Sequence, residues 1–245
     1  MATAPAANVG AMTARILVVE DDADLRDVMA AALVADGHDV QTCADGRAAL
    51  DALSEGAPEV VLLDVSLGAG IDGVEICRRM RAAGDDAYVM MLTARDSEPE
   101  VVVALEAGAD DYVAKPIGIV ELRSRVRAAL RRIHRTAAGG AAVAAEAVLR
   151  RAGITLDPAS RLASVGDCPL DLTRSEFAVV EDLLRAAGAI RTRAQLTQSI
   201  YGDDAYRDPR NIDLHMHNIR EKLRAAGGDP AVLVTVRGTG YRLAP

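Results

Sequence analysis

The run Val60-Val61-Leu62-Leu63-Asp64 constrains the fold of this chain more than any other stretch. Four apolar residues, two of them β-branched, end abruptly on an acid, and a glycine-rich segment follows. A short continuous apolar run of this kind is typical of a strand buried on both faces of a parallel sheet. An acid at the carboxyl end of such a strand stands where open α/β sheets bind their ligands. Taken alone, Asp64 could equally begin a turn or cap the next helix.

The first half of the chain repeats this pattern at regular intervals. Apolar runs predict four strands, near residues 15–19, 60–64, 88–92 and 111–114, and the more polar segment 38–42 is expected to form a fifth. Helical spacing follows each of them, and the last helix is expected from residue 118 to about 134. Five strands that alternate with five helices predict an α/β fold, a doubly wound five-stranded parallel sheet with helices on both faces.

The second half has a different pattern. Residues 136–147 are rich in Ala and Gly and carry one charge, which is typical of a linker. Beyond it we expect short strands, three helices and a final hairpin, near residues 154–157, 161–165, 169–172, 174–187, 193–200, 209–226, and 232–236 with 241–243. The prediction is a first domain over 12–135, a linker over 136–147, and a smaller α+β domain over 148–245.

Charge is divided unevenly between these halves. Up to Leu149 the chain has 14 Lys and Arg against 24 Asp and Glu, a net of −10, and from Arg150 onward it has 14 against 12, a net of +2. This asymmetry predicts that the two halves of the chain have different functions. No apolar run approaches the ~18 residues that a membrane-spanning helix needs, so no membrane partner is expected. The three cysteines have no paired spacing, which indicates reduced thiols in a cytoplasm.

Several chemically useful side chains follow strands of the first domain. Because parallel strands present their carboxyl ends at one rim, we expect a cluster there of Glu20, Asp21, Asp64, Thr93 and Lys115. Carboxylates packed together repel one another unless a cation joins them. Oxygen ligands suit Mg²⁺, and a neutralised carboxylate can attack a phosphoryl group while a lysine balances the charge. Individually, Asp21 or Asp22 could cap the first helix, Thr93 could be a neutral strand end and Lys115 an ordinary solvated lysine.

Together these residues resemble the receiver domain of two-component response regulators. The matching segments are Val18-Val19-Glu20-Asp21-Asp22, Leu62-Leu63-Asp64, Leu92-Thr93-Ala94 and Asp110-Asp111-Tyr112-Val113-Ala114-Lys115-Pro116. The resemblance implies that Asp64 is the phosphoacceptor of a partner sensor histidine kinase. It implies that Mg²⁺ is held by Asp64, Glu20, Asp21 and the backbone carbonyl of Ser66. It also implies a switch pair, Thr93 and Tyr112, and a cis bond between Lys115 and Pro116.

The resemblance further implies a homodimer, and one loop departs from the family pattern. Relatives pair through the fourth helix, fifth strand and fifth helix, a role that charged residues here fit: Asp110, Asp111, Arg123, Arg125 and Arg127. The loop after Asp64 takes eight steps to Asp72 instead of seven, with Gly68-Ala69-Gly70 and no proline. One extra residue beside the metal carbonyl could loosen the site.

The last long helix carries the chemistry of the second domain. Ile212, Met216, Ile219 and Leu223 recur at steps of four, three and four, which predicts one buried stripe. The opposite face and its flank would then carry the polar side chains and one leucine: Arg210, Leu214, His217, Asn218, Arg220, Glu221 and Arg224. Arg and Asn can read guanine and adenine edges in a major groove. On charge alone, a plain surface helix is the alternative.

The second domain resembles the winged helix-turn-helix of OmpR/PhoB-type regulators. The matching segments are Leu172-Thr173-Arg174-Ser175-Glu176-Phe177, Tyr201-Gly202, Arg210-Asn211-Ile212-Asp213-Leu214-His215 and Thr235-Val236-Arg237-Gly238-Thr239-Gly240-Tyr241-Arg242-Leu243. The resemblance implies a recognition helix from Pro209, a wing that contacts DNA through Thr235 and Arg237, and a loop from Tyr201 to Asp208 that meets RNA polymerase. It implies binding to double-stranded DNA at tandem half-sites.

The prediction is therefore a cytoplasmic, phosphorylation-switched transcription factor rather than an enzyme. Two alternatives remain. The altered loop leaves open a regulator that binds DNA without phosphorylation. A phosphatase that forms an aspartyl-phosphate could also place Asp64 after a central strand, but such enzymes resemble a pattern with a second acid two residues on, where this chain has Ser66.

Overall fold

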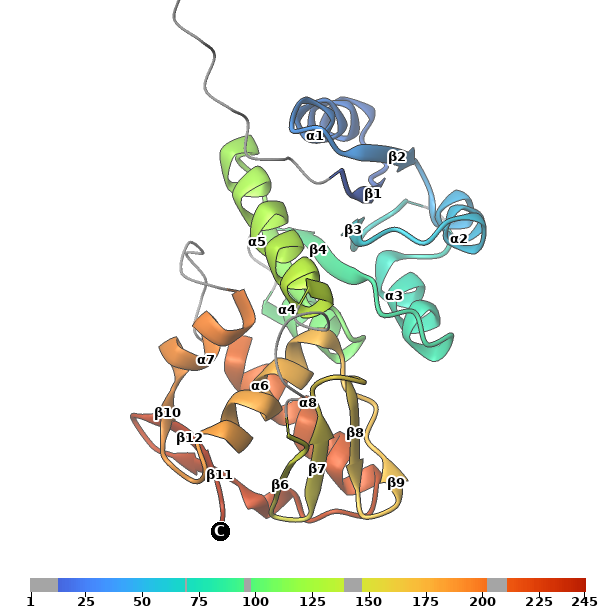
Figure 1. Ribbon diagram of the computed structural model, residues 1–245. Coiled ribbons are helices and arrows are strands. Elements are labelled where there is room, and N and C mark those ends of the chain that lie inside the picture. Colours follow the sequence, from blue (N-terminus) through green and yellow to red (C-terminus); the bar gives the residue numbers. More distant parts are fainter. Residues whose placement is uncertain (1–12, 69, 95–97, 139–146, 202–210) are drawn as a thin grey trace, which may run out of the picture.

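The computed structural model describes residues 13–68, 70–94, 98–138, 147–201 and 211–245. A five-stranded parallel sheet with helices on both faces forms the first domain (Figure 1). A smaller domain of antiparallel strands and three longer helices follows it. None of the helices in these ranges is long and apolar enough to span a membrane.

The strand order of the first sheet is β2-β1-β3-β4-β5, and every neighbouring pair is parallel. Its strands are Arg15–Val19 (β1), Asp39–Cys43 (β2), Val60–Asp64 (β3), Tyr88–Ala94 (β4) and Asp111–Lys115 (β5). All five residues of β3 are buried, as the continuous apolar run predicts. The predicted α/β fold is confirmed.

Two separate cores hold the helices against the sheet. The helices are Ala23–Ala35 (α1), Gly46–Glu55 (α2), Gly73–Ala82 (α3), Glu98–Glu106 (α4) and Ile119–Ala138 (α5). Ile16 and Val18 of β1 pack toward α1 and α5, whereas Leu17 and Val19 pack toward α2, α3 and α4. Successive side chains of a strand point to opposite faces, so both layers bury apolar surface.

Helix α5 is longer than the sequence pattern indicates. It continues to Ala138 instead of ending near His134, so residues 136–138 of the predicted linker are helical. Residues 139–146 lie outside the described ranges. The buried side chains of α5 recur at steps of four and three, and they include Leu122, Val126, Ala129 and Ile133. The additional turn carries α5 toward the second domain (Figure 1).

The second domain contains two antiparallel sheets around three helices. Leu149–Arg151 (β6), Ile154–Asp157 (β7), Leu162–Val165 (β8) and Cys168–Pro169 (β9) form one sheet in that order. Arg191–Thr192 (β10), Leu233–Val236 (β11) and Gly240–Leu243 (β12) form the other, in the order β10-β12-β11. The helices are Arg174–Arg185 (α6), Arg193–Tyr201 (α7) and Asn211–Ala225 (α8), and a short 3₁₀ helix spans Pro230–Val232.

The strand predicted over 169–172 is wrong for all but its first residue. Strand β9 ends at Pro169, and Thr173 then caps the start of α6. The Thr173 hydroxyl accepts a hydrogen bond from the Glu176 amide, and the Glu176 carboxylate accepts one from the Thr173 amide. This capping box satisfies two backbone donors and fixes the helix start. The short strands β6 and β10 were not predicted.

The predicted stripe of α8 is confirmed, but its outer face is not open. Ile212, Met216, Ile219 and Leu223 are buried in the core of the second domain. Leu214, placed by the sequence pattern on the exposed face, packs against the core of the first domain instead. Helix α8 lies against α4, and α7 lies against α5. The two domains are thus in direct contact.

Candidate functional site

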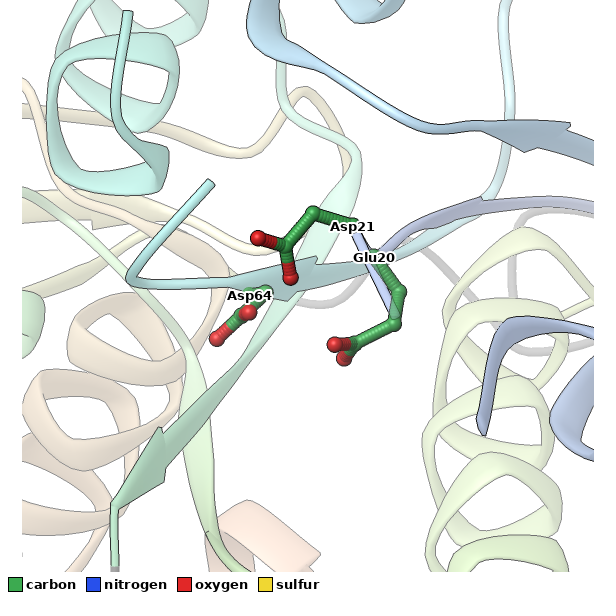
Figure 2. A group of neighbouring side chains, drawn as sticks. All are labelled: Glu20, Asp21 and Asp64. Carbon is green, nitrogen blue, oxygen red and sulfur yellow. The ribbon is translucent and has the colours of Figure 1, made fainter. Parts of the chain in front are cut away.

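Three carboxylates meet beyond the ends of β1 and β3. Glu20 and Asp21 follow β1, Asp64 ends β3, and one ligand oxygen from each lies within 4.8 Å of the others (Figure 2). The parallel register pairs Val19 with Leu63, so the two strands finish side by side. In the described part of the chain this is the one group of three or more His, Cys, Asp or Glu side chains that could hold a metal ion.

Lys115 joins this cluster from the end of β5. Its Nζ lies 2.8 Å from Asp64 Oδ2 and donates a 2.8 Å hydrogen bond to Glu20 Oε1. Burial acts to lower the pKa of Lys115, but the hydrogen bonds and negative charges of Asp64 and Glu20 outweigh it and raise the pKa above its usual value. Lys115 is therefore a fixed positive charge at the rim.

The charge of the cluster fits a divalent cation. Burial raises the pKa of Glu20, and the negative charge of Asp64 adds to this, although the hydrogen bond from Lys115 opposes it. The cluster contains three carboxylates and one ammonium group, so ionising all of the carboxylates leaves an excess of negative charge. All the donors are oxygen atoms, the ligands that Mg²⁺ prefers. The donor set thus matches the predicted metal.

Thr93 and Tyr112 lie on the neighbouring strands β4 and β5. Thr93 is 1% exposed, and its hydroxyl has no hydrogen-bond partner among the described residues. A buried hydroxyl without a partner is costly, which makes it a ready donor for an oxygen ligand. Tyr112 is half-buried and packs partly against the core shared with α4.

The structure separates the roles of two adjacent acids. Asp22, not Asp21, caps α1, because its carboxylate accepts a hydrogen bond of 3.0 Å from the Leu25 amide. Asp21 takes part in the carboxylate cluster instead. The alternative in which Asp21 only caps the first helix is therefore excluded.

The loop after Asp64 accommodates its unusual length through glycine. Gly68 and Gly70 adopt φ of 61° and 121°, values that other residues reach only with strain. Ser66 donates its backbone N–H to Asp64 Oδ1 at 3.3 Å, and Asp72 caps α3. Residue 69 lies outside the described ranges. The loop closes without displacing Asp64 from the rim.

Two further backbone features shape the rim. A Cβ atom at Gly73 would lie 2.0 Å from the carbonyl oxygen of Asp64, so only glycine fits there. The bond between Lys115 and Pro116 is cis, as the resemblance implies.

The residues predicted to contact DNA do not form one open surface. His217, Arg224, Thr235 and Arg237 are exposed. Arg220 donates to the Leu233 carbonyl and to Thr235 Oγ1, and Arg224 forms an ion pair with Glu221.

Asn218 is engaged by the first domain. Its Nδ2 donates a 2.8 Å hydrogen bond to the carbonyl of Leu105 in α4. Arg210 and the loop 202–208 predicted to meet RNA polymerase lie outside the described ranges. Asn218 therefore cannot reach a base while this contact stands.

Four of the five charges predicted to pair between copies are used inside the chain, whereas Arg127 is exposed. Asp110 is completely buried and bonds to Arg81, with Nη2 2.8 Å from Oδ2. The remaining ion pairs join Arg125 to Asp111 and Glu121, and Arg123 to Asp36. Sequence reasoning missed these pairings, because most of the partners are distant in the chain.

Comparison with known proteins agrees with this geometry. Residues 16–127 match the family described as response regulator receiver domain, and residues 167–243 match transcriptional regulatory protein, C terminal. Response regulator MprA of Mycolicibacterium vanbaalenii is 39% identical over 232 residues, which cover 95% of this chain and 98% of the relative. MprA of Mycobacterium tuberculosis strain H37Rv is 38% identical over the same length.

The chain is a response regulator of the OmpR/PhoB type. Regulators of this type are phosphorylated by histidine kinases and bind DNA, so the family is one of transcriptional regulators rather than enzymes. The fold of the regulator is also that of a RitR mutant, with a TM-score of 0.77 at 22% identity over 94% of this chain and 99% of the other. At this identity the likeness concerns the fold alone.

Proposed function

We propose that this response regulator accepts a phosphoryl group on Asp64 from a sensor histidine kinase and then binds promoter DNA as a dimer. The observation that carries the proposal is the position of Lys115, within 2.8 Å of both Asp64 and Glu20 at the rim. A lysine in that place can neutralise charge on a phosphoryl oxygen while the carboxylate attacks.

The reaction needs little from the protein except placement. An Asp64 oxygen forms a bond to phosphorus, the bond from phosphorus to the kinase imidazole nitrogen breaks, and that nitrogen takes a proton from solvent. Lys115 holds the carboxylate in place, and the hydroxyl of Thr93, which has no partner in the described ranges, can donate to the incoming phosphoryl oxygens.

The acidic cluster is suited to a magnesium ion. Glu20, Asp21 and Asp64 would hold it, with the backbone carbonyl of Ser66 as a further ligand by analogy with the family. When bound, Mg²⁺ supplies positive charge that offsets the repulsion between the carboxylate and the phosphoryl oxygens.

The output is proposed to be DNA binding by α8 and the β11–β12 wing. Phosphorylation adds roughly −1.5 to −2 charge at Asp64, and Thr93 and Tyr112 would pass the change to the face formed by α4, β5 and α5. A dimer through that face would place two recognition helices on tandem half-sites about one helical turn apart. We assign the receiver to residues 12–135, the linker to 136–147 and the DNA-binding domain to 148–245.

The test is labelling of the full chain by acetyl phosphate, read as a mass increase of one phosphoryl group. Asp64→Ala is expected to abolish labelling. Asp21→Asn should slow labelling and raise the Mg²⁺ concentration that labelling requires, whereas the adjacent cap variant Asp22→Asn should label like the wild type because Asp22 holds a helix end instead. Labelling of the Asp64→Ala protein at another residue would contradict the assignment.

The altered loop sustains a second candidate, DNA binding that does not depend on phosphorylation. The loop takes eight steps from Asp64 to Asp72, and Gly68 and Gly70 within it adopt positive φ. Equal footprint affinity of acetyl phosphate-treated wild type and Asp64→Asn would favour this second candidate.

A further inference from the structure

The contact between the two domains is a polar network buried around Asp110. Its Oδ2 accepts hydrogen bonds from Arg81 and from the Val89 amide, both within the receiver. Its Oδ1 accepts a 3.1 Å hydrogen bond from the Ser175 amide in the second domain. Its backbone carbonyl accepts from the Tyr201 hydroxyl at 3.1 Å and from Ser175 Oγ at 3.3 Å.

The carboxylate of Asp110 acts on a helix terminus. Ser175 is the second residue of α6, and the amides of a first helical turn have no partner within the helix. A buried negative charge at that end also complements the positive end of the helix dipole. Asp110 therefore stabilises α6 from the other domain.

Arg132 holds the same region from the end of α5. Its guanidinium donates to the Ile200 carbonyl at 3.0 Å, to Ser175 Oγ at 3.4 Å and to the Arg174 carbonyl. Ile200 stands in the last turn of α7, directly before the loop expected to meet RNA polymerase. Carbonyls at a helix end also lack partners in the helix, so the arginine satisfies them.

This network lies beside the contact that covers the recognition helix. Leu214 packs on the receiver core, and Asn218 bonds to the Leu105 carbonyl. The same receiver face, formed by α4, β5 and α5, is the one proposed to form the dimer. One surface therefore has two competing occupants, the chain's own DNA-binding domain and a second copy.

We propose that Asp110 and Arg132 form a latch that holds α8 against α4 and keeps the unphosphorylated regulator from binding DNA. The latch rests on the proposed function in one respect, that α8 reads DNA. Opening requires Asp110 to release the Ser175 amide, after which the α4–β5–α5 face is open to a second copy. Thr93 and Tyr112 would then act on the closed state that Asp110 and Arg132 hold.

The test uses the full unphosphorylated chain with Arg132→Met, Asp110→Ala and a control, Arg127→Met, at an exposed position of the same helix. Hydrogen exchange at α4 and α8 and small-angle scattering report opening. We expect faster exchange at both helices and a larger radius of gyration for the first two variants, and wild-type behaviour for the control. Because Asp110→Ala also loses the bond to Arg81, Arg132→Met is the deciding variant, and its unchanged exchange and radius would overturn the latch.

A second measurement separates the latch from the proposed function. The probe is a duplex selected from a random-sequence library with the acetyl phosphate-treated wild type. Opening should raise the affinity of unphosphorylated Arg132→Met for this duplex by roughly 5- to 150-fold, the usual range for coupled sites. If Arg132→Met opens but binds the duplex no more tightly than the unphosphorylated wild type, the proposed role of α8 is contradicted. If Arg132→Met stays closed, the latch is contradicted.

Discussion

The two functional regions of this regulator differ in how completely the closed chain assembles them. At the receiver rim, Glu20, Asp21, Asp64 and Lys115 already lie together. On the DNA-binding domain, Asn218 is bonded to the receiver and Arg220 is bonded to strand β11 of its own wing. The comparison teaches that the input site is built by the topology of one sheet, whereas the output surface depends on how two domains are placed.

The sharpest test of the preassembled rim is Lys115→Met. It removes the ammonium between Asp64 and Glu20 and keeps an unbranched side chain of similar length. Labelling by acetyl phosphate should slow by roughly 10²- to 10³-fold, the usual effect of removing one preorganised charge-stabilising group. Arg47→Met, which alters an exposed ion pair on α2, is the matched control. A labelling rate within a factor of two of wild type would show that the rim does not depend on its lysine.

His215 is buried where the two domains meet, so the pH dependence of stability tests how the domains are placed. Burial lowers its pKa to about 4, with Asp110 opposing the shift and Arg132 and Lys222 adding to it. Below the ordinary pKa of 6.5, His215 of the unfolded chain binds a proton, whereas in the folded chain it stays neutral until the pH reaches about 4. Stability therefore falls as the pH drops from about 6.5 to about 4, and His215 does not change it above pH 6.5. The full loss is about 3 kcal/mol.

Urea unfolding between pH 7.5 and 4.5 measures this loss. His215→Gln should flatten the acid limb of the profile, whereas His217→Gln, at an exposed position on the same helix, should leave it unchanged. An acid limb that keeps its slope in His215→Gln would assign the loss to another group.

Gly73→Ala gives the smallest effect and tests how rigid the rim is. The new Cβ would lie 2.0 Å from the Asp64 carbonyl oxygen, and backbone cannot yield cheaply. We expect a loss of about 1–3 kcal/mol in stability together with slower labelling. Gly118→Ala, whose Cβ would meet nothing within 4 Å, should stay within about 0.5 kcal/mol of wild type. Thermal unfolding of both variants decides the matter, and equal stabilities would refute the tight packing.

The sheet and its rim could be predicted because the strands are indicated by local sequence patterns. Continuous apolar runs indicated every strand of the sheet except the more polar β2, and parallel topology then placed the residues that end the strands at one edge. The same logic reached the stripe of α8, whose four members are all buried.

Contacts between distant elements had no such signal. The partner of Asp110 in the second domain is 65 residues away, and His134 meets Glu59 across 75 residues with 2.7 Å between Nε2 and Oε2. Asp110 and Asp111 resemble a surface pair in the sequence, although both are fully buried. Leu214 was misplaced for the same reason, since a helical pattern does not specify which domain covers a face.

The length of α5 has a mechanical consequence. Its 20 residues form a rod about 30 Å long, with the cis-proline segment just before one end and Arg132 near the other. A tilt of only about 5° around the first turn would move Arg132, about 20 Å along the helix, by about 2 Å. That displacement exceeds the tolerance of a hydrogen bond, so a small rotation beside the rim is sufficient to withdraw the guanidinium from α7.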